Sequence, residues 1–248
     1  MVRTLSSQGS KDVWLYGLHA VRAALANPKR TVRRAVLTKR AAEVIGRNLL
    51  ANIRYELVGA EGVSRLLPPA AVHQGAALLC DPLPNRDLRE VVAAAGGQRI
   101  LVVLDQIFDP QNVGAIMRVA AAFGVSAVIA QERHAPSESG ALAKAASGAL
   151  DIVPFVAVVN IARSLEVLGG LGFWRIALEI GGGVTLKEAV VDRDCALVLG
   201  SEGSGIRRLV RSRCDVAATV PMSLMMESLN VSSAAAIALY EIRRGLHS

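Results

Sequence analysis

The chain is poor in aromatic residues and cysteine, and it lacks a long apolar run. Aromatic residues make up 4% of its 248 residues although 52% are hydrophobic, so we expect an aliphatic core. The cysteines Cys80, Cys195 and Cys214 are odd in number and far apart, which predicts free thiols and neither a disulfide frame nor a zinc site. No apolar run approaches the ~20 residues of a membrane span, and the N-terminal residues lack a signal-peptide pattern. We therefore expect a cytoplasmic protein without a bound metal.

The excess positive charge lies in the first third of the chain. Residues 1–85 hold 12 of the 28 Lys and Arg but only five of the 21 Asp and Glu, a net of +7, and the 16 basic and 16 acidic residues that follow cancel. The stretch NPKRTVRRAVLTKR favours contact with a polyanion such as RNA, although solubility alone also explains a basic surface. The residues predicted to bind RNA are Arg30, Arg33, Arg34, Lys39 and Arg40. Arg207, Arg208 and Arg211 either extend this surface or form a solvated helix face.

Two α/β segments are predicted on either side of the stretch DPLPNRD. In the first, strands are expected at 34–38, 55–59 and 75–80, and helices at 17–27, 41–52 and 61–67. In the second, short apolar runs occur at 99–107, 126–132, 173–180 and 195–200. Helical stretches separate most of these runs, which predicts a parallel sheet with helical crossovers. We expect a linker over residues 82–98.

Arg118 lies within the helical stretch DPQNVGAIMRVAAAFG, residues 109–124. With Asn112 as the expected N-cap, helical spacing predicts a core face of Ala115, Ile116, Val119, Ala120 and Phe123. Arg118 falls off this face, one turn from Gly114, where small side chains let a ligand or another chain approach. An ordinary solvated arginine is the alternative. The preceding DPQN turn favours a ligand site at the carboxyl end of a strand.

Two later stretches combine an irregular or glycine-rich backbone with polar side chains. In LVLGSEGSGIRRLV, residues 197–210, a buried strand runs into a glycine-containing loop and then a helix, so backbone can approach a ligand closely. This loop lacks the Lys-Ser or Lys-Thr ending of a triphosphate loop, but its Glu202 can orient a polar ligand or pair with an arginine. Residues 220–241 are apolar without a regular period up to Asn230, the expected cap of the last helix. The methionines there suit either a core or a ligand pocket.

Together and in this order, the three stretches resemble the signature of the SpoU/TrmH RNA ribose 2′-O-methyltransferases, a branch of the SPOUT superfamily. The first motif is matched by Asp109, Pro110, Asn112, Gly114 and Arg118. The second is matched by Gly200, Glu202, Gly203 and Gly205. The third is matched by Pro221, Met222, Ser228, Leu229, Asn230, Val231 and Ser232. At the front, YGLHAVRAAL and VHQGAALL are similar to the RNA-binding module of those family members that methylate a guanosine of large-subunit ribosomal RNA.

This resemblance implies two domains and a cofactor. Residues 99–248 would form a trefoil-knotted α/β domain that binds S-adenosylmethionine and forms a homodimer, and residues 13–81 a small L30e-like α/β domain that binds RNA. Residues 1–12 have no counterpart in the family and are expected to be disordered. The implied cofactor-binding residues are Gly200, Gly203, Val220, Pro221, Met222 and Leu229. Leu224 departs from the family pattern, which usually has glycine there, so a positive φ would strain this loop and weaken cofactor binding.

The implied catalytic residues are Arg118, Asn112, Glu202, Ser228 and Asn230. Because a guanidinium is a poor base, we interpret Arg118 as the group that orients the ribose hydroxyl and adjacent phosphate and stabilises developing negative charge, with a role as base left open. The other four residues would fix that guanidinium and the ribose by hydrogen bonds. Two alternatives remain, a tRNA ribose methyltransferase and a non-catalytic RNA-binding protein of ribosome assembly. The N-terminal module favours ribosomal RNA, and only Leu224 supports the non-catalytic alternative.

Overall fold

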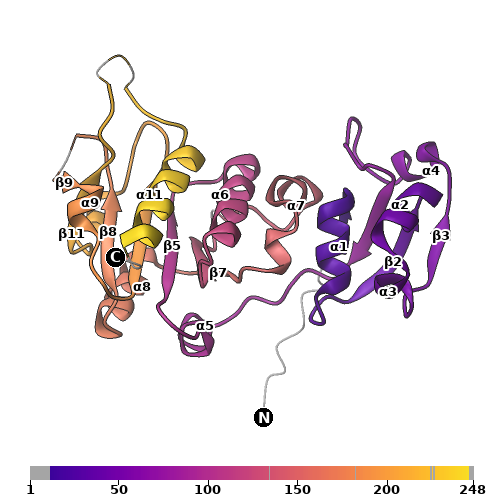
Figure 1. Cartoon of the computed structure of the whole chain (residues 1–248), viewed down its shortest axis with the longest axis horizontal. Helices are drawn as coiled ribbons and strands as arrows, with labels where there is room; N and C mark the ends of the chain where they lie inside the picture. The colour runs from indigo at the N-terminus through magenta and orange to yellow at the C-terminus, as the bar shows by residue number, and fades with distance from the viewer. Residues whose placement is uncertain (1–11, 134, 182, 224, 226, 246–248) are drawn as a thin grey trace, which may run out of the picture. The chain divides into compact units, whose positions relative to one another are not determined.

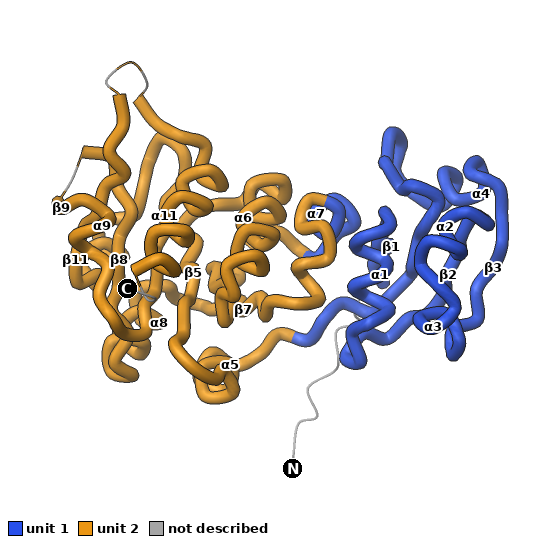
Figure 2. Tube along the Cα trace, viewed as in Figure 1, with its two compact units in different colours: residues 1–84, 138–144 blue, residues 85–137, 145–248 orange. Residues whose placement is uncertain are grey.

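The computed structural model describes residues 12–133, 135–181, 183–223, 225 and 227–245, which form two α/β units (Figure 1). Unit 1 comprises residues 1–84 and 138–144, and unit 2 comprises residues 85–137 and 145–248 (Figure 2). Of the tail predicted to be disordered, residues 1–11 lie outside the described residues. No helix in the described ranges is both long and apolar enough to cross a membrane.

Unit 1 is built on a four-stranded sheet with the order β1-β4-β2-β3. Its strands are β1 (Val13–Tyr16), β2 (Val32–Leu37), β3 (Tyr55–Leu57) and β4 (Ala76–Cys80). Strand β4 runs antiparallel to β1 and β2, whereas β2 and β3 are parallel. Its helices include α1 (Leu18–Ala26), α2 (Lys39–Ile45), α3 (Arg47–Leu50) and α4 (Ala60–Ser64). Aliphatic side chains of β2, β4 and α4 pack with Tyr16 in its core.

One helix predicted over 41–52 is two helices in the structure. Gly46, between α2 and α3, has φ 92° and ψ 150°, a backbone conformation that is essentially restricted to glycine. Its N–H donates to the Ala42 carbonyl oxygen and thereby ends α2. A glycine inside a helical pattern is a helix-end signal, so the correction was available from the sequence.

Unit 2 is built on a seven-stranded sheet with the order β7-β6-β5-β10-β8-β11-β9, and each of its described strand pairs is parallel. Its strands are β5 (Ile100–Asp105), β6 (Ala127–Gln131), β7 (Phe155–Val158), β8 (Trp174–Leu178), β9 (Val184–Thr185), β10 (Cys195–Gly200) and β11 (Val216–Thr219). The four strands predicted from apolar runs correspond to β5, β6, β8 and β10. The parallel sheet is therefore confirmed, and β7, β9 and β11 are additions at or near its edges.

Helices cover both faces of this sheet. One face packs against α5 (Leu88–Ala94), α8 (Ile161–Gly170) and α10 (Arg208–Arg211) in a shared aliphatic core. On the other face α6 (Pro110–Ala122) and α11 (Val231–Gly245) lie side by side, and the rings of Phe123 and Tyr240 meet at 6.5 Å between centroids (Figure 1). The remaining helices are α7 (Gly140–Ala146), α9 (Leu186–Ala189) and the 3₁₀ turn Ala149–Asp151.

The predicted linker over 82–98 contains a folded helix. Residues 82–87 have no regular structure, but α5 follows at once, and its Leu88, Val91 and Val92 are buried in the core of unit 2. Asp87 caps this helix by accepting two backbone N–H groups of the first turn. The i, i+3, i+4 spacing of the three apolar residues behind an aspartate is the helical signal that corrects the prediction.

Residues 138–144 belong to unit 1 although they follow β6 in the chain. Glu138 forms an ion pair with Arg30, and its second carboxylate oxygen accepts the Leu83 N–H at 2.8 Å. Gly140 lies so close to β1 that a Cβ there would be 2.5 Å from the Trp14 carbonyl oxygen. Two separate stretches of chain therefore build unit 1.

Candidate active site

Helix α6 begins earlier than predicted. Asp109 is its N-cap and accepts the backbone N–H groups of Gln111 and Asn112, each at 3.2 Å, and Pro110 follows it in the first turn. Aspartate followed by proline is a strong start signal, which corrects the prediction of Asn112 as the cap. Asn112 instead lies in the first turn, and its side chain makes a different contact.

The buried face of α6 also differs from the prediction. Ile116 and Ala120 are buried as predicted, whereas Ala115, Val119 and Phe123 are only half-buried. The other buried residues of the helix are Val113, Gly114 and Met117. A Cβ at Gly114 would lie 2.4 Å from the Ala145 Cβ, so Ala145 fills the surface that we expected to be open beside this glycine.

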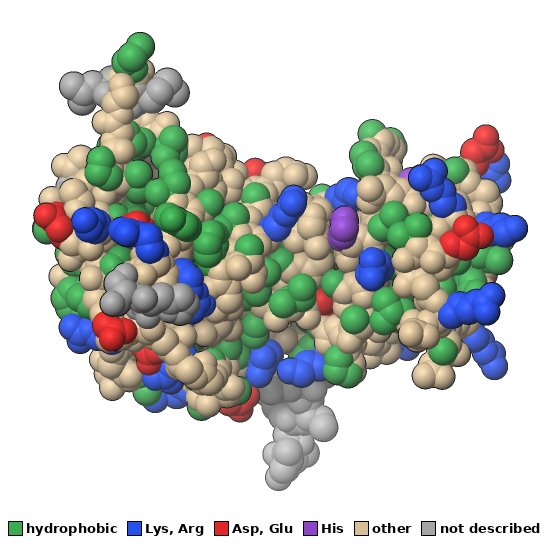
Figure 3. Space-filling model, viewed as in Figure 1, with side chains coloured by type: hydrophobic (Ala, Val, Ile, Leu, Met, Phe, Trp, Pro, Cys, Tyr) green, Lys and Arg blue, Asp and Glu red, His purple; other side chains and the backbone are tan. Residues whose placement is uncertain are grey.

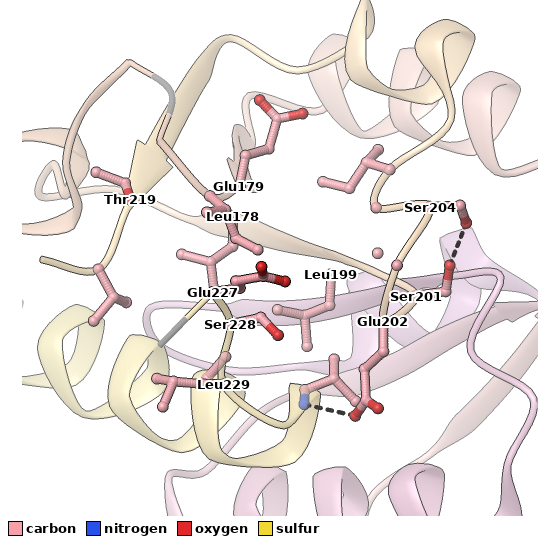
Figure 4. A pocket seen from close by; sticks show the side chains of 18 of the residues that line it. Leu178, Glu179, Leu199, Ser201, Glu202, Ser204, Thr219, Glu227, Ser228 and Leu229 are labelled. Carbon is pink, nitrogen blue, oxygen red and sulfur yellow. Dashed lines mark hydrogen bonds between the residues drawn. The ribbon is translucent and has the colours of Figure 1, made fainter. Parts of the chain in front are cut away.

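Three predicted catalytic side chains meet at the start of α11. Asn230 Nδ2 donates to Asn112 Oδ1 and to Glu202 Oε1, each at 2.9 Å. Glu202 reaches from the loop after β10 to this helix start and accepts the Val231 N–H at 3.2 Å (Figure 4). Asn230 Oδ1 accepts the Ser232 N–H at 2.9 Å, as expected of a cap. This network joins all three motifs, although 118 residues separate Asn112 from Asn230.

Arg118 and Ser228 lie outside this network. Arg118 is exposed on α6 and, within the described part of the chain, makes no hydrogen bond or ion pair. It is six residues beyond Asn112, about 9 Å further along the helix axis. The hydrogen bonds that the guanidinium was expected to donate to Asn112, Glu202 and Asn230 are therefore not formed in this chain, where these side chains bind one another.

A pocket of about 610 Å³ lies at the carboxyl ends of β8, β10 and β11 (Figure 4). Its described lining contains Glu202, Ser228 and five of the six residues predicted to bind the cofactor, namely Gly200, Gly203, Val220, Met222 and Leu229. Pro221, Asn112, Asn230 and Arg118 are not among the lining residues. The prediction that Leu224 strains the adjoining loop stays a prediction, since Leu224 lies outside the described residues.

The loop after β10 forms one wall of this pocket with its backbone. A Cβ at Gly200 would lie 2.2 Å from the carbonyl carbon of Gly205 and 2.4 Å from the Ile206 nitrogen, so only glycine fits. Ser201 and Gly205 exchange two backbone hydrogen bonds of 3.0 and 3.2 Å, which folds the loop back on itself. Gly203, at the turn, has a φ of 96°. The glycines thus allow the close backbone approach that the sequence predicts.

A buried carboxylate that the sequence analysis overlooked holds the end of the same loop. Asp105, at the end of β5, is fully buried and accepts both the backbone N–H and Nε of Arg207 at 2.8 Å. Arg207 Nη2 also donates to Gln131 Oε1 at the end of β6. The signal was an aspartate that ends the apolar run ILVVLD, because a buried carboxylate requires a partner.

Carboxylates dominate the charged lining of the pocket. Glu179 pairs with Arg211 at 2.8 Å, and Glu202 binds the start of α11. Glu227 is exposed and makes no ion pair among the described residues. The lining therefore suits a ligand that carries positive charge. Arg207 and Arg211 are half-buried and pair with carboxylates of unit 2, so they do not form a solvated helix face, and Arg208 is the exposed member of the group that the sequence suggested as an extension of the RNA surface.

The basic cluster predicted in unit 1 divides into buried, paired and exposed residues. The Arg30 side chain has 0% exposure and pairs with Glu138, so it stabilises the fold and does not reach a phosphate, which corrects the prediction. Arg33 binds Asp81 through two hydrogen bonds of 2.7 and 2.9 Å, which lower the pKa of that carboxyl group.

The exposed part of this cluster remains suited to RNA. Arg34 binds Glu56 at 2.7 and 3.0 Å, but both side chains are solvated, so a phosphate competes with the carboxylate at little cost. Lys39 and Arg40 are exposed, and neither has an ion pair in the ranges that the structure describes. Lys and Arg side chains are spread over the visible face of unit 1 with few acidic ones among them (Figure 3).

An open parallel sheet with a pocket at the carboxyl ends of its strands defines a ligand-binding α/β domain. The chain belongs to the SpoU rRNA Methylase family, which residues 99–240 match. Residues 14–86 match a second family, described as RNA 2′-O ribose methyltransferase substrate binding.

Relatives cover nearly the whole chain. It is 35% identical to the 23S rRNA (guanosine-2′-O-)-methyltransferase RlmB of Coxiella burnetii, over 95% of this chain and 96% of that protein. It is 36% identical to RlmB of Neisseria meningitidis serogroup B, over 93% and 94%. The crystal structure of the SpoU methyltransferase AviRb from Streptomyces viridochromogenes in complex with AdoMet has the same fold, with a TM-score of 0.79 and 22% identity over 96% of this chain and 91% of AviRb.

Proposed function

We propose that the protein transfers a methyl group from S-adenosylmethionine to the 2′-hydroxyl of a guanosine ribose in 23S ribosomal RNA. The observation that carries this proposal is the site in unit 2, where a network joining all three motifs adjoins a pocket lined by five of the six expected cofactor residues. The substrate follows from the relatives named for this reaction and from the substrate-binding family that matches residues 14–86. We assign RNA binding to residues 13–81 together with residues 138–144. We assign methyl transfer to residues 99–248 except for residues 138–144.

The residues of the pocket fit S-adenosylmethionine in size, backbone and charge. Its volume of about 610 Å³ lies within the range of small-molecule sites. The wall at Gly200 and Gly203 has no side chain, so main-chain groups face the ligand, and Val220, Met222 and Leu229 supply apolar contacts for an adenine. The carboxylates suit the positive charges of this cofactor. When bound, S-adenosylmethionine supplies an electrophilic methyl group.

The side chains of the site orient the ribose. Glu202 fixes Asn230, and Asn230 fixes the side-chain amide of Asn112, so three polar groups are held in place before RNA binds. Arg118 has no competing carboxylate among the described residues, so its planar guanidinium can bind the substrate phosphate and stabilise charge that develops on the hydroxyl oxygen. Ser228 adds a hydroxyl to the pocket lining.

A homodimer explains why Arg118 does not line the pocket of its own chain. We propose that α6 of one protomer places Arg118 at the pocket of its partner. In support of a dimer, α11 beside α6 leaves Ile237 41% and Tyr240 57% exposed, and such apolar side chains are typical of an interface.

We also propose the trefoil knot and an L30e-like topology for unit 1. The hydrogen bonds that Glu202 accepts from Asn230 and Val231 support the knot, because they connect the loop after β10 to the chain segment that enters α11. The mixed sheet and short helices of unit 1 support the second assignment. A ribosomal RNA substrate supports a cytoplasmic location, which we also propose.

The test is methyl transfer from labelled S-adenosylmethionine to unmodified 23S rRNA, with bulk tRNA as the comparison. We expect label in 23S rRNA, retained on a ribose 2′-oxygen when nucleosides are analysed by mass spectrometry. Label in tRNA alone would assign the enzyme to the tRNA alternative. Cofactor binding by calorimetry without transfer to RNA or to partly assembled subunits would favour the non-catalytic alternative.

A further inference from the structure

A second groove lies on unit 2 beside the edge strand β7. It has a volume of about 550 Å³, and its walls are residues 85–89, the carboxyl half of β7 and the first two turns of α8. Three arginines line it, Arg86, Arg89 and Arg163. The only carboxylate among its lining residues, Asp87, is engaged as the cap of α5. The groove is therefore positively charged.

These three arginines have no carboxylate partner in the part of the chain that the structure describes, unlike six other arginines of unit 2. Among the described residues, Arg86, Arg89 and Arg163 form no ion pair. The arginines of this unit that each bind a carboxylate include Arg99, Arg175, Arg211 and Arg213. Since residues 86–248 carry no net charge, three unpaired cations at one groove are a local departure from the charge balance. Such a concentration of positive charge is expected where an anionic ligand binds.

The backbone edge of β7 is closed, which argues against a peptide as the ligand. Asn85 Nδ2 donates to the Ala157 carbonyl oxygen at 2.9 Å, and Asn85 Oδ1 accepts the Ala157 N–H at 3.0 Å. Gln131 Nε2 occupies the Val159 carbonyl oxygen at 3.2 Å. A peptide strand would need these groups in order to pair with the sheet. A ligand of this groove is therefore expected to bind to the arginine side chains and not to the backbone of β7.

The groove and the cofactor pocket both lie on the side of the parallel sheet where the strands have their carboxyl ends. The pocket is at the carboxyl ends of β8, β10 and β11, and the groove begins at the carboxyl end of β7. Strand β7 is three places from β10 in the sheet, a distance of about 14 Å at ordinary strand spacing. The start of α8 also faces the groove with the positive end of its helix dipole. A few nucleotides of RNA are long enough to connect the two sites.

We propose that the groove of Arg86, Arg89 and Arg163 binds the phosphodiester backbone of the RNA substrate, a short distance along the strand from the ribose that is methylated. The inference rests on the proposed function and adds a contact on the catalytic unit to the one proposed for unit 1. Arginine is suited to this contact because its planar fork binds two phosphate oxygens at once.

The test compares two variants with the same change in charge. Arg89→Gln/Arg163→Gln alters the groove, and the control Lys187→Gln/Arg193→Gln removes two exposed cations that have no ion pair among the described residues, one on α9 and one just before β10. Affinity for unmodified 23S rRNA is measured over a range of salt concentrations. We expect the groove variant to bind more weakly and the slope of log affinity against log salt to flatten by about 1.4, at about 0.7 for each lost single-strand contact. The control should keep the wild-type slope.

Two further measurements separate this inference from the proposed function. In the groove variant we expect an unchanged S-adenosylmethionine affinity, an unchanged kcat at saturating RNA and a raised KM for RNA. A salt slope equal to that of the control would overturn the groove assignment while methylation by the wild type still supports the proposed function. Absence of methylation by the wild type would reject the proposed function, and the salt slopes would still show whether the groove binds RNA. Thermal unfolding of both variants verifies that each is folded.

Discussion

Arg118 is exposed and has no partner within the described part of α6 and its surroundings, so its replacement should affect the reaction and not the fold. For Arg118→Lys we expect kcat to fall about 100-fold, because an ammonium keeps the charge but loses the planar pair of donors. The free energy of unfolding should change by less than about 0.5 kcal/mol. Single-turnover methylation and chemical denaturation measure the two effects. Turnover close to that of the wild type would show that a planar fork is not needed.

Glu202 connects two other catalytic candidates with the start of α11. In Glu202→Ala the Val231 N–H loses its acceptor and Asn230 loses one of its two, so we expect a cost of about 0.5–2 kcal/mol in unfolding free energy, as for a lost helix cap. Methyl transfer should fall at least about tenfold, because Asn230 and Asn112 are less well oriented. Glu166→Ala, at an exposed ion pair outside the site, is the control. Equal kinetics for the two variants would remove Glu202 from the site.

At the level of single residues, the sequence motifs predicted much of the site but not its buried charges. The resemblance to the family motifs implied roles for Asn112, Glu202 and Asn230, and the fold brings these side chains into contact. Arg30 was predicted to bind RNA because a cluster of charges in the sequence does not show which residues form ion pairs in the fold. Its carboxylate partner lies 108 residues away. Asp105 was overlooked for the same reason, since Arg207 lies 102 residues along the chain.

The loop after β10 depends on a glycine at the end of a strand. For Gly200→Ala we expect the loop to shift, because the new Cβ would overlap the backbone of Gly205 and Ile206, which a side-chain rotation cannot relieve. S-adenosylmethionine affinity should fall at least about tenfold. Calorimetry measures this, and Gly170→Ala is the matched control, since a Cβ at Gly170 meets nothing within 4 Å. A wild-type affinity in Gly200→Ala would mean that this loop does not form the cofactor wall.

Elements with a long, uniform pattern were predicted best. The apolar runs of β5 and β10 identify buried parallel strands, whereas β7, β9 and β11 have only two to four residues each and resemble loops in the sequence. The prediction joined α2 and α3 into one helix because it did not treat Gly46 as a helix end. It missed α5 because Pro82 and Pro84 suggested that the linker extended over the residues that follow them. A prediction from periodicity thus recovers the sheet but leaves its edges and the entry into unit 2 undefined.

At the scale of the whole molecule, a shared active site predicts complementation between two variants that are each defective in a different part of the site. When equal amounts of Arg118→Ala and Gly200→Ala are mixed and their subunits exchange, half of all dimers should be heterodimers. Each heterodimer has one intact site if Arg118 acts at the pocket of the partner subunit. We therefore expect about a quarter of the wild-type activity, and almost none if Arg118 serves its own chain. Methylation before and after exchange is the measurement, and each variant carried through the same procedure alone is the control.

RNA binding by unit 1 should depend on its exposed cations. For Lys39→Gln/Arg40→Gln we expect weaker binding of 23S rRNA and a salt slope lower by about 1.4, with S-adenosylmethionine affinity unchanged, because the cofactor pocket is formed by unit 2 alone. The matched control is Arg22→Gln/Arg65→Gln, two exposed arginines of unit 1, one on α1 and one directly after α4. An identical loss in both variants would indicate a general effect of net charge and not a defined RNA surface.

The two-part construction of unit 1 sets the order in which the protein is completed during translation. Arg30 leaves the ribosome 108 residues ahead of Glu138, the carboxylate that it pairs with in the buried part of the unit. At roughly 5–20 residues per second, the nascent chain holds this guanidinium without that partner for roughly 5–20 s. Unit 1 therefore begins first but cannot be completed until β5 and β6, the first two strands of the methyltransferase sheet, have been made.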